Sequence, residues 1–255
     1  MNFLKRIIFK IFGVKSYLKI VSQLFFKAYS WGFLKGKRNF YCHYIVRKFV
    51  HEGDYVIDLG ANLGYYSYIF SKLVGKSGKV HSIEPVGLFR DVLSRNLRKR
   101  TNVEIIPYAI GETDNEKIKM GVPVTSAYFS HGRTHVLTEE ENCSMTFDAT
   151  VMRPDSIFKN LSKLNYIKCD IEGYEGIAIP LFREILIKFK PVLQIEIDSK
   201  NKAGLFTFLK SLGYLAYEVN GEKLFSIAGP EVPTYSDVIF IDKNQTARYN
   251  EFISI

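Results

Sequence analysis

Cysteine is scarce in this sequence, and its spacing does not suit a metal site. The 255 residues contain three cysteines, Cys42, Cys143 and Cys169, an odd number in which no pair has the CxxC spacing. A zinc site is therefore not expected, and thiols in a reducing cytosol are the simpler interpretation. Internal repeats and low-complexity tracts are also missing, so the pattern indicates neither a solenoid nor a long linker.

The sequence has no hydrophobic run long enough to cross a membrane. The longest uncharged run of the N-terminal segment covers residues 20–26, whereas a spanning helix needs about 20 apolar residues. Lysines interrupt any apolar region that resembles a signal peptide, so secretion is not expected. With 47 % hydrophobic residues, the chain can bury one good core, and we expect a cytoplasmic protein.

Acidic residues are absent from residues 1–40, which hold nine lysines and arginines. The other 215 residues carry 26 basic and 26 acidic side chains, so the formal charge of +9 belongs to this segment. Its apolar residues recur every three to four positions, as in an amphipathic helix. We divide the chain into a basic helical segment, residues 1–50, and a catalytic domain, residues 51–255.

Two interpretations of the basic segment remain open, and the two can coexist. The segment can pack as a helical cap over the catalytic domain, or residues 1–40 can lie on an anionic membrane, peripherally at the inner membrane surface. A basic arm also suits nucleic acid. We do not expect a nucleic-acid partner, because the rest of the chain is electrically neutral and lacks a proline–aromatic motif of the NPPY kind.

The chain is organised around residues 55–66, which read YVIDLGANLGYY. An apolar strand runs into a turn that contains Gly60 and Gly64, and apolar residues at helical spacing follow it. Glycines let the backbone approach a ligand, and a helix N-terminus offers free N–H groups, so this turn suits a nucleotide-like ligand. Asp58, at the end of the strand, would repel a pyrophosphate and attract an ammonium group or hydroxyl groups.

A second carboxylate restricts the ligand further. Residues 79–83 predict the next strand, and Glu84 ends it, twenty residues after Gly64. A carboxylate at this position can accept hydrogen bonds from both hydroxyls of a ribose. The two acids together favour a nucleoside with a positive or zwitterionic tail and without phosphates, and S-adenosylmethionine meets this description.

Two phosphate-binding motifs resemble parts of the chain, but neither fits. Residues 75–77, GKS, look like the end of a P-loop, yet Phe70 stands where that motif needs its earlier glycine. The NAD fingerprint needs a glycine where this turn has Asn62. A glycine turn without any ligand would leave the paired Glu84 unexplained, so the cofactor interpretation is preferred.

Three motifs together resemble one family of enzymes. They are DLGANLGYYS at residues 58–67, IEP at 83–85 and KCDIEGYE at 168–175. The combination resembles the FkbM family of S-adenosylmethionine-dependent methyltransferases. The resemblance implies an α/β, Rossmann-like class I methyltransferase fold: a seven-stranded, mostly parallel sheet in the order 3-2-1-4-5-7-6, with helices on both faces. It implies S-adenosyl-L-methionine as the cofactor, bound by Asp58, Gly60, Ala61, Asn62, Gly64, Tyr65, Glu84, Pro85, Ala109, Ile110 and Asp170.

Hydrophobic periodicity predicts the remaining elements. Residues 112–150 show little periodicity and are interpreted as a functional lid, apart from short strands at 117–120 and 149–151. A hairpin with a type I′ turn at Asn220–Gly221 is expected near the end of the chain. The expected strands are 55–59, 79–83, 102–106, 165–169, 191–197, 214–219, 223–227 and 237–241. The expected helices are 64–74, 86–98, one with its N-cap at Asp155 or Ser156, one from Glu175 to Phe189, and 202–212.

A hydroxyl acceptor must lose a proton during methyl transfer, so a general base within hydrogen-bond reach is useful. The tip of the fourth parallel strand faces the methyl group in this sheet order, which makes Asp170 and Glu172 the primary candidates, with Lys168 as a counter-ion or substrate contact. His131 and His135 of the expected lid are the alternative bases. Carboxylates at strand tips suit Mg²⁺, and Asp170, Glu172, Glu196 and Asp198 are the candidates, but no further oxygen-rich motif supports a metal site, and none is assigned. The other histidines, His43, His51 and His81, are expected to be structural or exposed.

The prediction is therefore an S-adenosylmethionine-dependent O-methyltransferase. The family resemblance suggests a hydroxyl of a glycan, a glycolipid precursor or a secondary metabolite as the acceptor. A membrane-seeking N-terminal segment slightly favours a lipid-linked acceptor and a role in polysaccharide modification. Two alternatives stay open: N-methylation of a small molecule or glycan substituent, which needs a base less, and a protein of the same fold that binds the cofactor or a membrane without catalysis.

Overall fold

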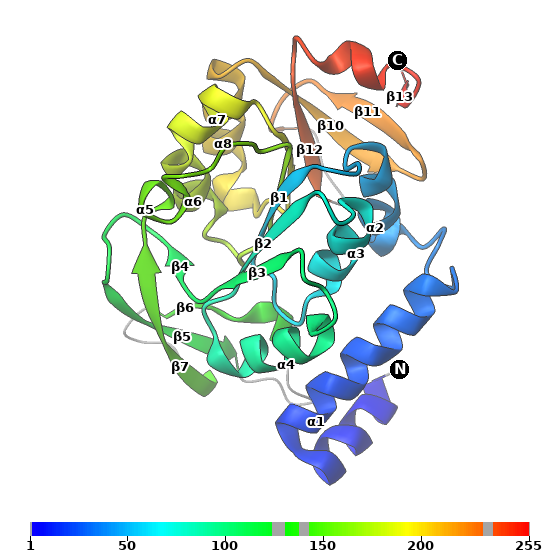
Figure 1. Cartoon of the computed structure of the whole chain (residues 1–255), viewed down its shortest axis with the longest axis vertical. Coiled ribbons are helices and arrows are strands. Elements are labelled where there is room, and N and C mark those ends of the chain that lie inside the picture. Colours follow the sequence, from blue (N-terminus) through cyan, green and yellow to red (C-terminus); the bar gives the residue numbers. More distant parts are fainter. Residues whose placement is uncertain (1, 124–130, 138–142, 232–236, 255) are drawn as a thin grey trace.

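A nine-stranded mixed sheet runs through the molecule (Figure 1). The structure is a computed structural model, and it describes residues 2–123, 131–137, 143–231 and 237–254. The parallel strands are β1 (Tyr55–Leu59), β2 (Lys79–Ile83), β3 (Val103–Ile106), β8 (Tyr166–Cys169) and β9 (Val192–Ile195). The antiparallel finish consists of β10 (Tyr214–Asn220), β11 (Lys223–Ile227) and β12 (Val238–Asp242), and β13 (Ile253–Ser254) pairs in parallel with β11.

The strand order is β3-β2-β1-β8-β9-β12-β10-β11-β13. The first seven strands follow the predicted order 3-2-1-4-5-7-6, so the class I methyltransferase topology is confirmed. The sheet has nine strands and not seven, because β11 of the hairpin and the short β13 extend it at the edge. In such a sheet, ligands bind outside the carboxyl ends of the parallel strands.

Helices cover both faces of this sheet, as predicted. On one face lie α2 (Tyr41–Ile45), α3 (Tyr65–Leu73) and α4 (Gly87–Leu97). On the other lie α5 (Pro154–Phe158), α6 (Glu175–Leu181), α7 (Arg183–Phe189) and α8 (Ser199–Ser211). Side chains of β1 alternate between the two layers, with Val56 in the core beneath α3 and Ile57 and Leu59 in the core beneath α6. This alternation follows from the period of two in a strand and places Asp58 on the α3 side.

Three local predictions were wrong. Asn220 pairs with Lys223, so the hairpin turn is Gly221–Glu222, and a positive φ at Gly221 only is the type II′ pattern. The helix expected from Glu175 to Phe189 is broken at Phe182, because Pro180 lacks an N–H and disfavours a continued helix. The N-cap of α5 is Arg153, since Pro154 occupies the first helical position.

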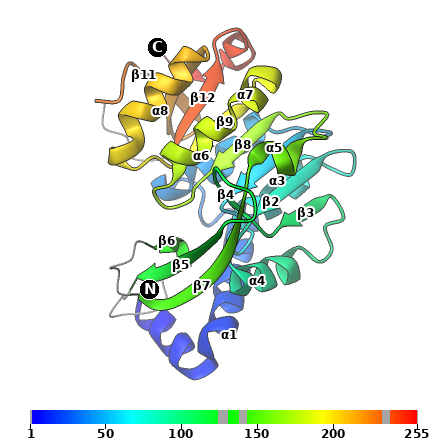
Figure 2. The same cartoon turned by 90° about the vertical axis from the view of Figure 1, so that its left-hand side faces the viewer.

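Residues 109–152 form a second sheet that the sequence did not predict as such. It contains β4 (Ala109–Ile110), β5 (Lys117–Pro123), β6 (His135–Val136) and β7 (Cys143–Met152), in the order β4-β7-β5-β6. The antiparallel pairing of β5 with β7 begins at Lys117 and Thr150, 33 residues apart. Figure 2 shows this small sheet next to α4 and α1. The described residues of the region expected to be a lid therefore lie largely in a sheet.

The first helix, α1 (Asn2–Ser30), bends at Gly13, which has a non-helical backbone (φ 69°, ψ 174°). Beyond the bend, Tyr17 and Leu18 are buried against Phe89 of α4 and Val122 of β5. The ammonium of Lys15 lies 2.5 Å from the carboxylate of Asp91 at the edge of this contact. Within the described part of the chain, no helix is both long and apolar enough to cross a membrane.

Candidate active site

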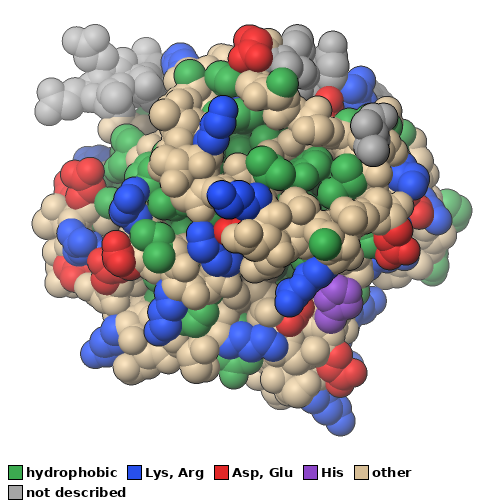
Figure 3. All heavy atoms as spheres, turned by 90° about the horizontal axis from the view of Figure 1, so that it is seen from above, with side chains coloured by type: hydrophobic (Ala, Val, Ile, Leu, Met, Phe, Trp, Pro, Cys, Tyr) green, Lys and Arg blue, Asp and Glu red, His purple; other side chains and the backbone are tan. Residues whose placement is uncertain are grey.

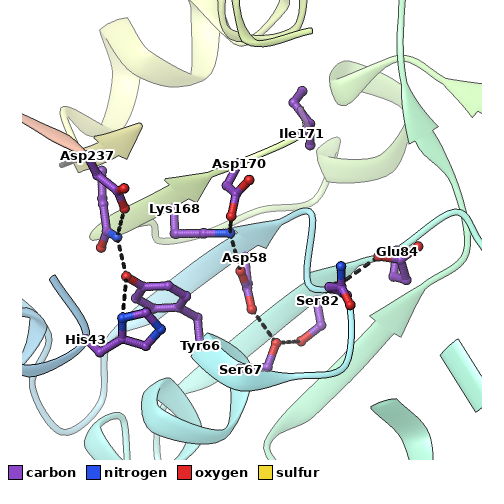
Figure 4. Close-up of polar contacts among 12 residues, drawn as sticks. His43, Asp58, Tyr66, Ser67, Ser82, Glu84, Lys168, Asp170, Ile171 and Asp237 are labelled. Carbon is purple, nitrogen blue, oxygen red and sulfur yellow. Dashed lines mark hydrogen bonds and ion pairs between the residues drawn. The ribbon is translucent and has the colours of Figure 1, made fainter. Parts of the chain in front are cut away.

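A cavity of 350 Å³ opens at the carboxyl ends of β1, β2, β8 and β9. Its walls combine the turn after β1, the end of β2 and the segment after β8, three stretches that the sequence analysis placed together (Figure 4). The predicted site residues that line it are Asp58, Gly60, Ala61, Asn62, Tyr65, Glu84, Pro85, Asp170 and Glu172. The motifs at 58–67, 83–85 and 168–175 thus face one space.

The turn after β1 owes its shape to one glycine. Gly60 has a φ of 81°, and a Cβ there would overlap the backbone carbonyl oxygen of Asp170. The backbone N–H groups of Gly60 and Ala61 donate to the carbonyl of Ile83, at 3.1 and 2.9 Å. These contacts hold the turn against β2 and against the end of β8. A ligand in the cavity can therefore meet the backbone of the turn on one side and the backbone after β8 on the other.

Glu84 is positioned by the backbone on both of its carboxylate oxygens. The N–H of Asn62 donates to Oε2 at 2.9 Å, and the N–H of Val86 donates to Oε1 at 2.8 Å. Burial raises the pKa of Glu84 to about 7, against the opposing effect of these two hydrogen bonds. Each carboxylate oxygen has a second lone pair, so Glu84 can still accept hydrogen bonds from two hydroxyls of a ligand in the cavity.

Gly64 lies behind the cavity and does not line it. It is the N-cap of α3 with a φ of 90°, and a Cβ there would come within 2.7 Å of Leu93 Cδ1 on α4. Its predicted role as a contact of the cofactor stays a prediction, and the structure shows a packing role for it. Gly64 allows α3 and α4 to approach closely and so keeps the turn in place.

Asp58 is completely buried and only partly paired. The hydroxyl of Ser67 donates to its Oδ2 at 2.5 Å, while Oδ1 lies 4.0 Å from Lys168 Nζ and accepts no hydrogen bond from a described residue. Burial raises its pKa, and Lys168 opposes this shift. A buried acceptor without a donor is costly, and a ligand that carries an ammonium or hydroxyl group would satisfy it.

A small apolar pocket of 40 Å³ adjoins the cavity. It shares Gly60, Pro85, Met120 and Ile171 with the cavity wall, and its remaining wall is Leu59, Ile83, Tyr108, Ala109, Ile110, Val136 and Tyr174. Ala109 and Ile110, which the sequence analysis named as cofactor-binding residues, therefore lie next to the main cavity and not in it. Apolar walls with polar groups on one side suit a flat heterocycle joined to a ribose.

Three ionisable side chains, Lys168, Asp170 and Glu196, gather where β8 and β9 end. The ammonium of Lys168, almost fully buried, lies 2.9 Å from Asp170 Oδ2. Burial disfavours the charge on Asp170, but Lys168 and a hydrogen bond with Glu196 outweigh it, so the pKa of Asp170 is lowered. Repulsion from Asp170, followed by desolvation, raises the pKa of Glu196 to about 9. Glu196 therefore holds a proton at neutral pH and shares it with the ionised Asp170.

Glu172 is exposed and lines the rim of the same cavity. Its backbone is left-handed (φ 55°), so the chain turns away from the direction of β8 at this residue. Desolvation of its carboxyl, followed by repulsion from Asp170 and Glu175, raises the pKa of Glu172 to about 7. A carboxyl whose pKa lies near the working pH can both accept and release a proton.

His43 and Tyr66 also line the cavity, although neither was a predicted site residue. Their rings stack at 4.1 Å between centroids, and the hydroxyl of Tyr66 lies 3.2 Å from His43 Nδ1. Gln194 Nε2 donates to the Tyr66 hydroxyl at 2.7 Å and also to the carboxylate of Asp237 (Figure 4). Burial, followed by repulsion from Lys168, lowers the pKa of His43 to about 3, so this wall is neutral.

Of the two histidines proposed as alternative bases, the structure describes the side chain of His135 only. His131 begins the short helix η3 (His131–Arg133), and its side chain lies outside the described residues, so its role stays a prediction. His135 Nδ1 contacts the carbonyl of Arg133 at 3.0 Å and does not line the cavity. Gly132 and Thr134 do line it. No group of three or more His, Cys, Asp or Glu in the described ranges is arranged to hold a metal ion.

These features define a class I, S-adenosylmethionine-dependent methyltransferase. The sequence profile of the Methyltransferase FkbM domain matches residues 58–216, more than half of the chain. The chain therefore belongs to the FkbM family of S-adenosylmethionine-dependent methyltransferases. None of the curated proteins compared with the sequence matches it significantly.

The chain is similar to several solved structures. The FkbM methyltransferase from Methylobacillus flagellatus KT is 17 % identical, with a TM-score of 0.50 over 74 % of this chain and 43 % of that protein. This chain thus spans less than half of the length of that methyltransferase. Fibrillarin from Aeropyrum pernix, solved with bound S-adenosyl-L-methionine, is 13 % identical (TM-score 0.41, 76 % of this chain, 67 % of that one). A Streptococcus mutans protein described as a methyltransferase, in complex with S-adenosylhomocysteine, is 11 % identical (TM-score 0.47, 79 % and 94 %).

S-adenosyl-L-methionine is the cofactor of this family, and the site in this chain fits it. Asp58 offers an acceptor without a donor, and Glu84 offers free lone pairs on two fixed oxygens. The apolar pocket at Ala109 and Ile110 suits the adenine. Because the cavity carries several carboxylates and one lysine, its charge also suits a cation such as a sulfonium.

Proposed function

We propose that this protein methylates a hydroxyl group, as an S-adenosylmethionine-dependent O-methyltransferase. When bound, the cofactor supplies an electrophilic methyl group. The observation that carries the proposal is the cluster of Asp170, Glu172 and Glu196 around one buried lysine, which is a means of accepting a proton. An acceptor hydroxyl needs such a group, whereas an acceptor that is already anionic would be repelled.

Glu172 is the general base in this proposal. It stands at the open rim, where an acceptor enters, and its pKa of about 7 leaves it largely ionised in a mildly alkaline medium. Asp170 is a less suitable base because its lowered pKa makes it a weaker proton acceptor. Asp170 instead keeps Lys168 in place and keeps Glu196 protonated, with the single proton of Glu196 donated to Asp170.

The acceptor class follows from the polar character of the wall. Acids, a lysine, a threonine and glycine backbone surround the acceptor side, so a molecule with several hydroxyls would find partners there. We favour a glycan or glycolipid precursor over an apolar secondary metabolite, in a cytoplasmic protein that takes part in polysaccharide modification. N-methylation remains the second candidate, because the same carboxylates would attract an ammonium group on an acceptor.

The pH dependence of turnover tests the role of Glu172. Because Glu172 must be ionised to accept a proton, we expect kcat/KM in wild type to fall about tenfold per pH unit below pH 7. Glu172→Gln should lose this slope and about 10²–10⁴-fold in rate, while the exposed control Glu184→Gln on α7 should behave as wild type.

A Glu172→Gln variant with an unchanged slope would remove Glu172 as the base. If turnover persists after both Asp170 and Glu172 have lost their carboxylates, an acceptor nitrogen is favoured over a hydroxyl. Assays use S-adenosylmethionine with pooled glycans, sugar nucleotides and lipid-linked sugars as acceptors, and the methylated atom is identified by mass spectrometry.

A further inference from the structure

Apolar side chains are exposed together at the end of α1 and in the turn that follows. Among the described residues, seven large hydrophobic side chains are exposed, and three of them, Leu24, Trp31 and Phe33, lie within ten residues of one another. Trp31 and Phe33 are 68 % and 67 % exposed, more than any of the other five. Their rings form an edge-to-face pair at 5.8 Å across Gly32, whose φ is 78°. Clustered exposed apolar groups mark an interaction surface more often than single ones do.

The same surface carries cations that have no acidic partner. Lys15, Lys35 and Arg38 pair with acids of the catalytic domain. By contrast, Lys19, Lys27 and Lys37 are exposed, and their side chains make no ion pair with any residue that the structure describes. The face of the molecule seen from above differs, since acidic and basic side chains are interspersed there (Figure 3).

Beyond Gly13, one face of α1 is buried and the opposite face is largely exposed, although Gln23 on that face donates a hydrogen bond to Asn96 Oδ1 of α4 at 2.8 Å. Tyr17, Leu18 and Phe26 point into the protein. Residues at helical spacing on the other side form an open groove of 410 Å³, lined by Ser16, Lys19, Ile20, Gln23, Leu24 and Lys27. We call this groove, together with Trp31, Phe33 and Lys37, the outer surface of α1. It combines apolar and cationic groups and contains no acid.

We propose that the outer surface of α1 binds the surface of a lipid bilayer that contains anionic lipids. Charge complementarity argues for this partner, because unpaired lysines attract anionic headgroups by about 1 kcal/mol each. Tryptophan and phenylalanine are suited to the boundary between headgroups and acyl chains, and a helix that lies in this boundary does not need to span the membrane.

Other partners fit the surface less well. A second copy of this chain would bring unpaired lysines against lysines, and like charges in contact destabilise a dimer. Nucleic acid would be held through its phosphates, which leaves the exposed side chains of Leu24 and Phe33 without a function. Only the bilayer accounts for both the cations and the apolar side chains.

The proposed surface is connected to the active site through Phe25. Its ring lies 4.5 Å from that of Tyr65 and 5.4 Å from that of His43, and both of these line the cavity. Phe25 is the neighbour of Leu24, which is on the outer surface. A protein docked through α1 would therefore hold its cavity close to the membrane, which suits a lipid-linked acceptor but does not require one.

The single tryptophan of the chain makes the test direct, because Trp31 is on the proposed surface and reports its own environment. We expect the emission of the full-length protein to shift to the blue, with protection from acrylamide, on phosphatidylglycerol vesicles but not on phosphatidylcholine vesicles. In co-sedimentation, the triple variant Lys19→Gln/Lys27→Gln/Lys37→Gln should bind on the order of a hundredfold more weakly, from the attraction lost with three lysines. Phe33→Ser should also weaken binding, whereas Phe225→Ser, at another exposed phenylalanine on β11, should not.

Each contrary result overturns the proposal. No change on phosphatidylglycerol vesicles removes the bilayer as the partner. A blue shift that grows with protein concentration without lipid identifies a second copy, and one that appears only with duplex RNA or DNA identifies a nucleic acid. Thermal stabilisation by S-adenosylhomocysteine is measured on every variant. It should be unchanged, so that a failure of membrane binding is distinguishable from a failure of the fold or of the proposed methyl transfer.

Discussion

The two halves of the cavity hold their carboxylates in different ways. In the cofactor half, Asp58 and Glu84 are buried and receive hydrogen bonds from neutral donors: a serine hydroxyl and two backbone N–H groups. In the acceptor half, Asp170, Glu172 and Glu196 face one another around a single lysine. Neutral, fixed donors give a rigid template for a ligand that does not change. Repulsion from the ionised Asp170 adds to burial and raises the pKa of Glu172 to about 7 and that of Glu196 to about 9, so two groups of this half titrate in the range that proton transfer needs.

The largest expected effect concerns Asp170, which the sequence analysis named both as a cofactor-binding residue and as a candidate general base. The charge of Asp170 pairs with Lys168, and the same charge raises the pKa of Glu196. Asp170→Asn removes this charge, so we expect kcat to fall at least about 10³-fold. The affinity for S-adenosylhomocysteine, measured by calorimetry, should fall much less. Asp198→Asn, at the N-cap of α8, is the matched control and should be neutral.

Equal losses of kcat and of affinity in Asp170→Asn would place this residue in the cofactor half and would erase the distinction. A rate near that of wild type would remove Asp170 from the site altogether.

An effect of intermediate size concerns the rigidity of the cofactor half. In Gly60→Ala, the new Cβ meets the carbonyl of Asp170 in a backbone conformation that costs a non-glycine residue of order 1–3 kcal/mol, so the protein should lose stability and cofactor binding together. Gly204→Ala in α8 is the matched control, because its Cβ meets nothing within 4 Å and alanine favours a helix. Thermal denaturation with and without S-adenosylhomocysteine measures both.

If Gly60→Ala retained the wild-type melting temperature and the shift with S-adenosylhomocysteine, the close approach of the turn to β8 would not be what shapes the site.

The smallest expected effect is a pH dependence that belongs to the cofactor half alone. The pKa of Glu84 is raised to about 7, and only its ionised form offers all its lone pairs to ribose hydroxyls. Since protonation competes with binding below the pKa, the dissociation constant of S-adenosylhomocysteine should rise roughly tenfold between pH 8 and pH 6. Glu84→Gln should bind more weakly at pH 8 and show a flat profile, while Glu104→Gln, on the exposed side of β3, should follow wild type.

A profile that stays steep in Glu84→Gln would assign the proton to another group, with Asp58 as the next candidate, since burial also raises its pKa.

The cofactor half was predicted almost completely because its parts are local. Asp58, Gly60 and Asn62 lie in one strand–turn–helix segment, and Glu84 ends the next parallel strand, which pairs directly with β1. The position of Gly64 in the turn was predicted, but its packing against α4 was not. The close approach of α3 to α4 depends on side chains of α4 that no motif specifies.

The acceptor half was predicted only where a motif passes through it. Asp170 and Glu172 belong to the motif at 168–175, but Glu196 was considered only as a metal ligand, and His43 was expected to be structural or exposed. His43 reaches the cavity by stacking on Tyr66, 23 residues away. The second sheet was missed for a similar reason, since β5 meets β7 across a long intervening segment and gains its partners only on folding.

By itself, the sequence determined the class of this protein. Hydrophobic periodicity set the order of strands and helices, and short motifs at strand ends set the cofactor, because parallel strands bring their carboxyl ends to one edge. Only the tertiary structure decided the chemistry of the acceptor half. The pKa of a carboxyl depends on burial and on charges within a few ångströms. Lys168 is two residues from Asp170, but Glu196 after β9 and His43 of α2 also act on Asp170, and these two are distant in the chain and adjacent only in the fold.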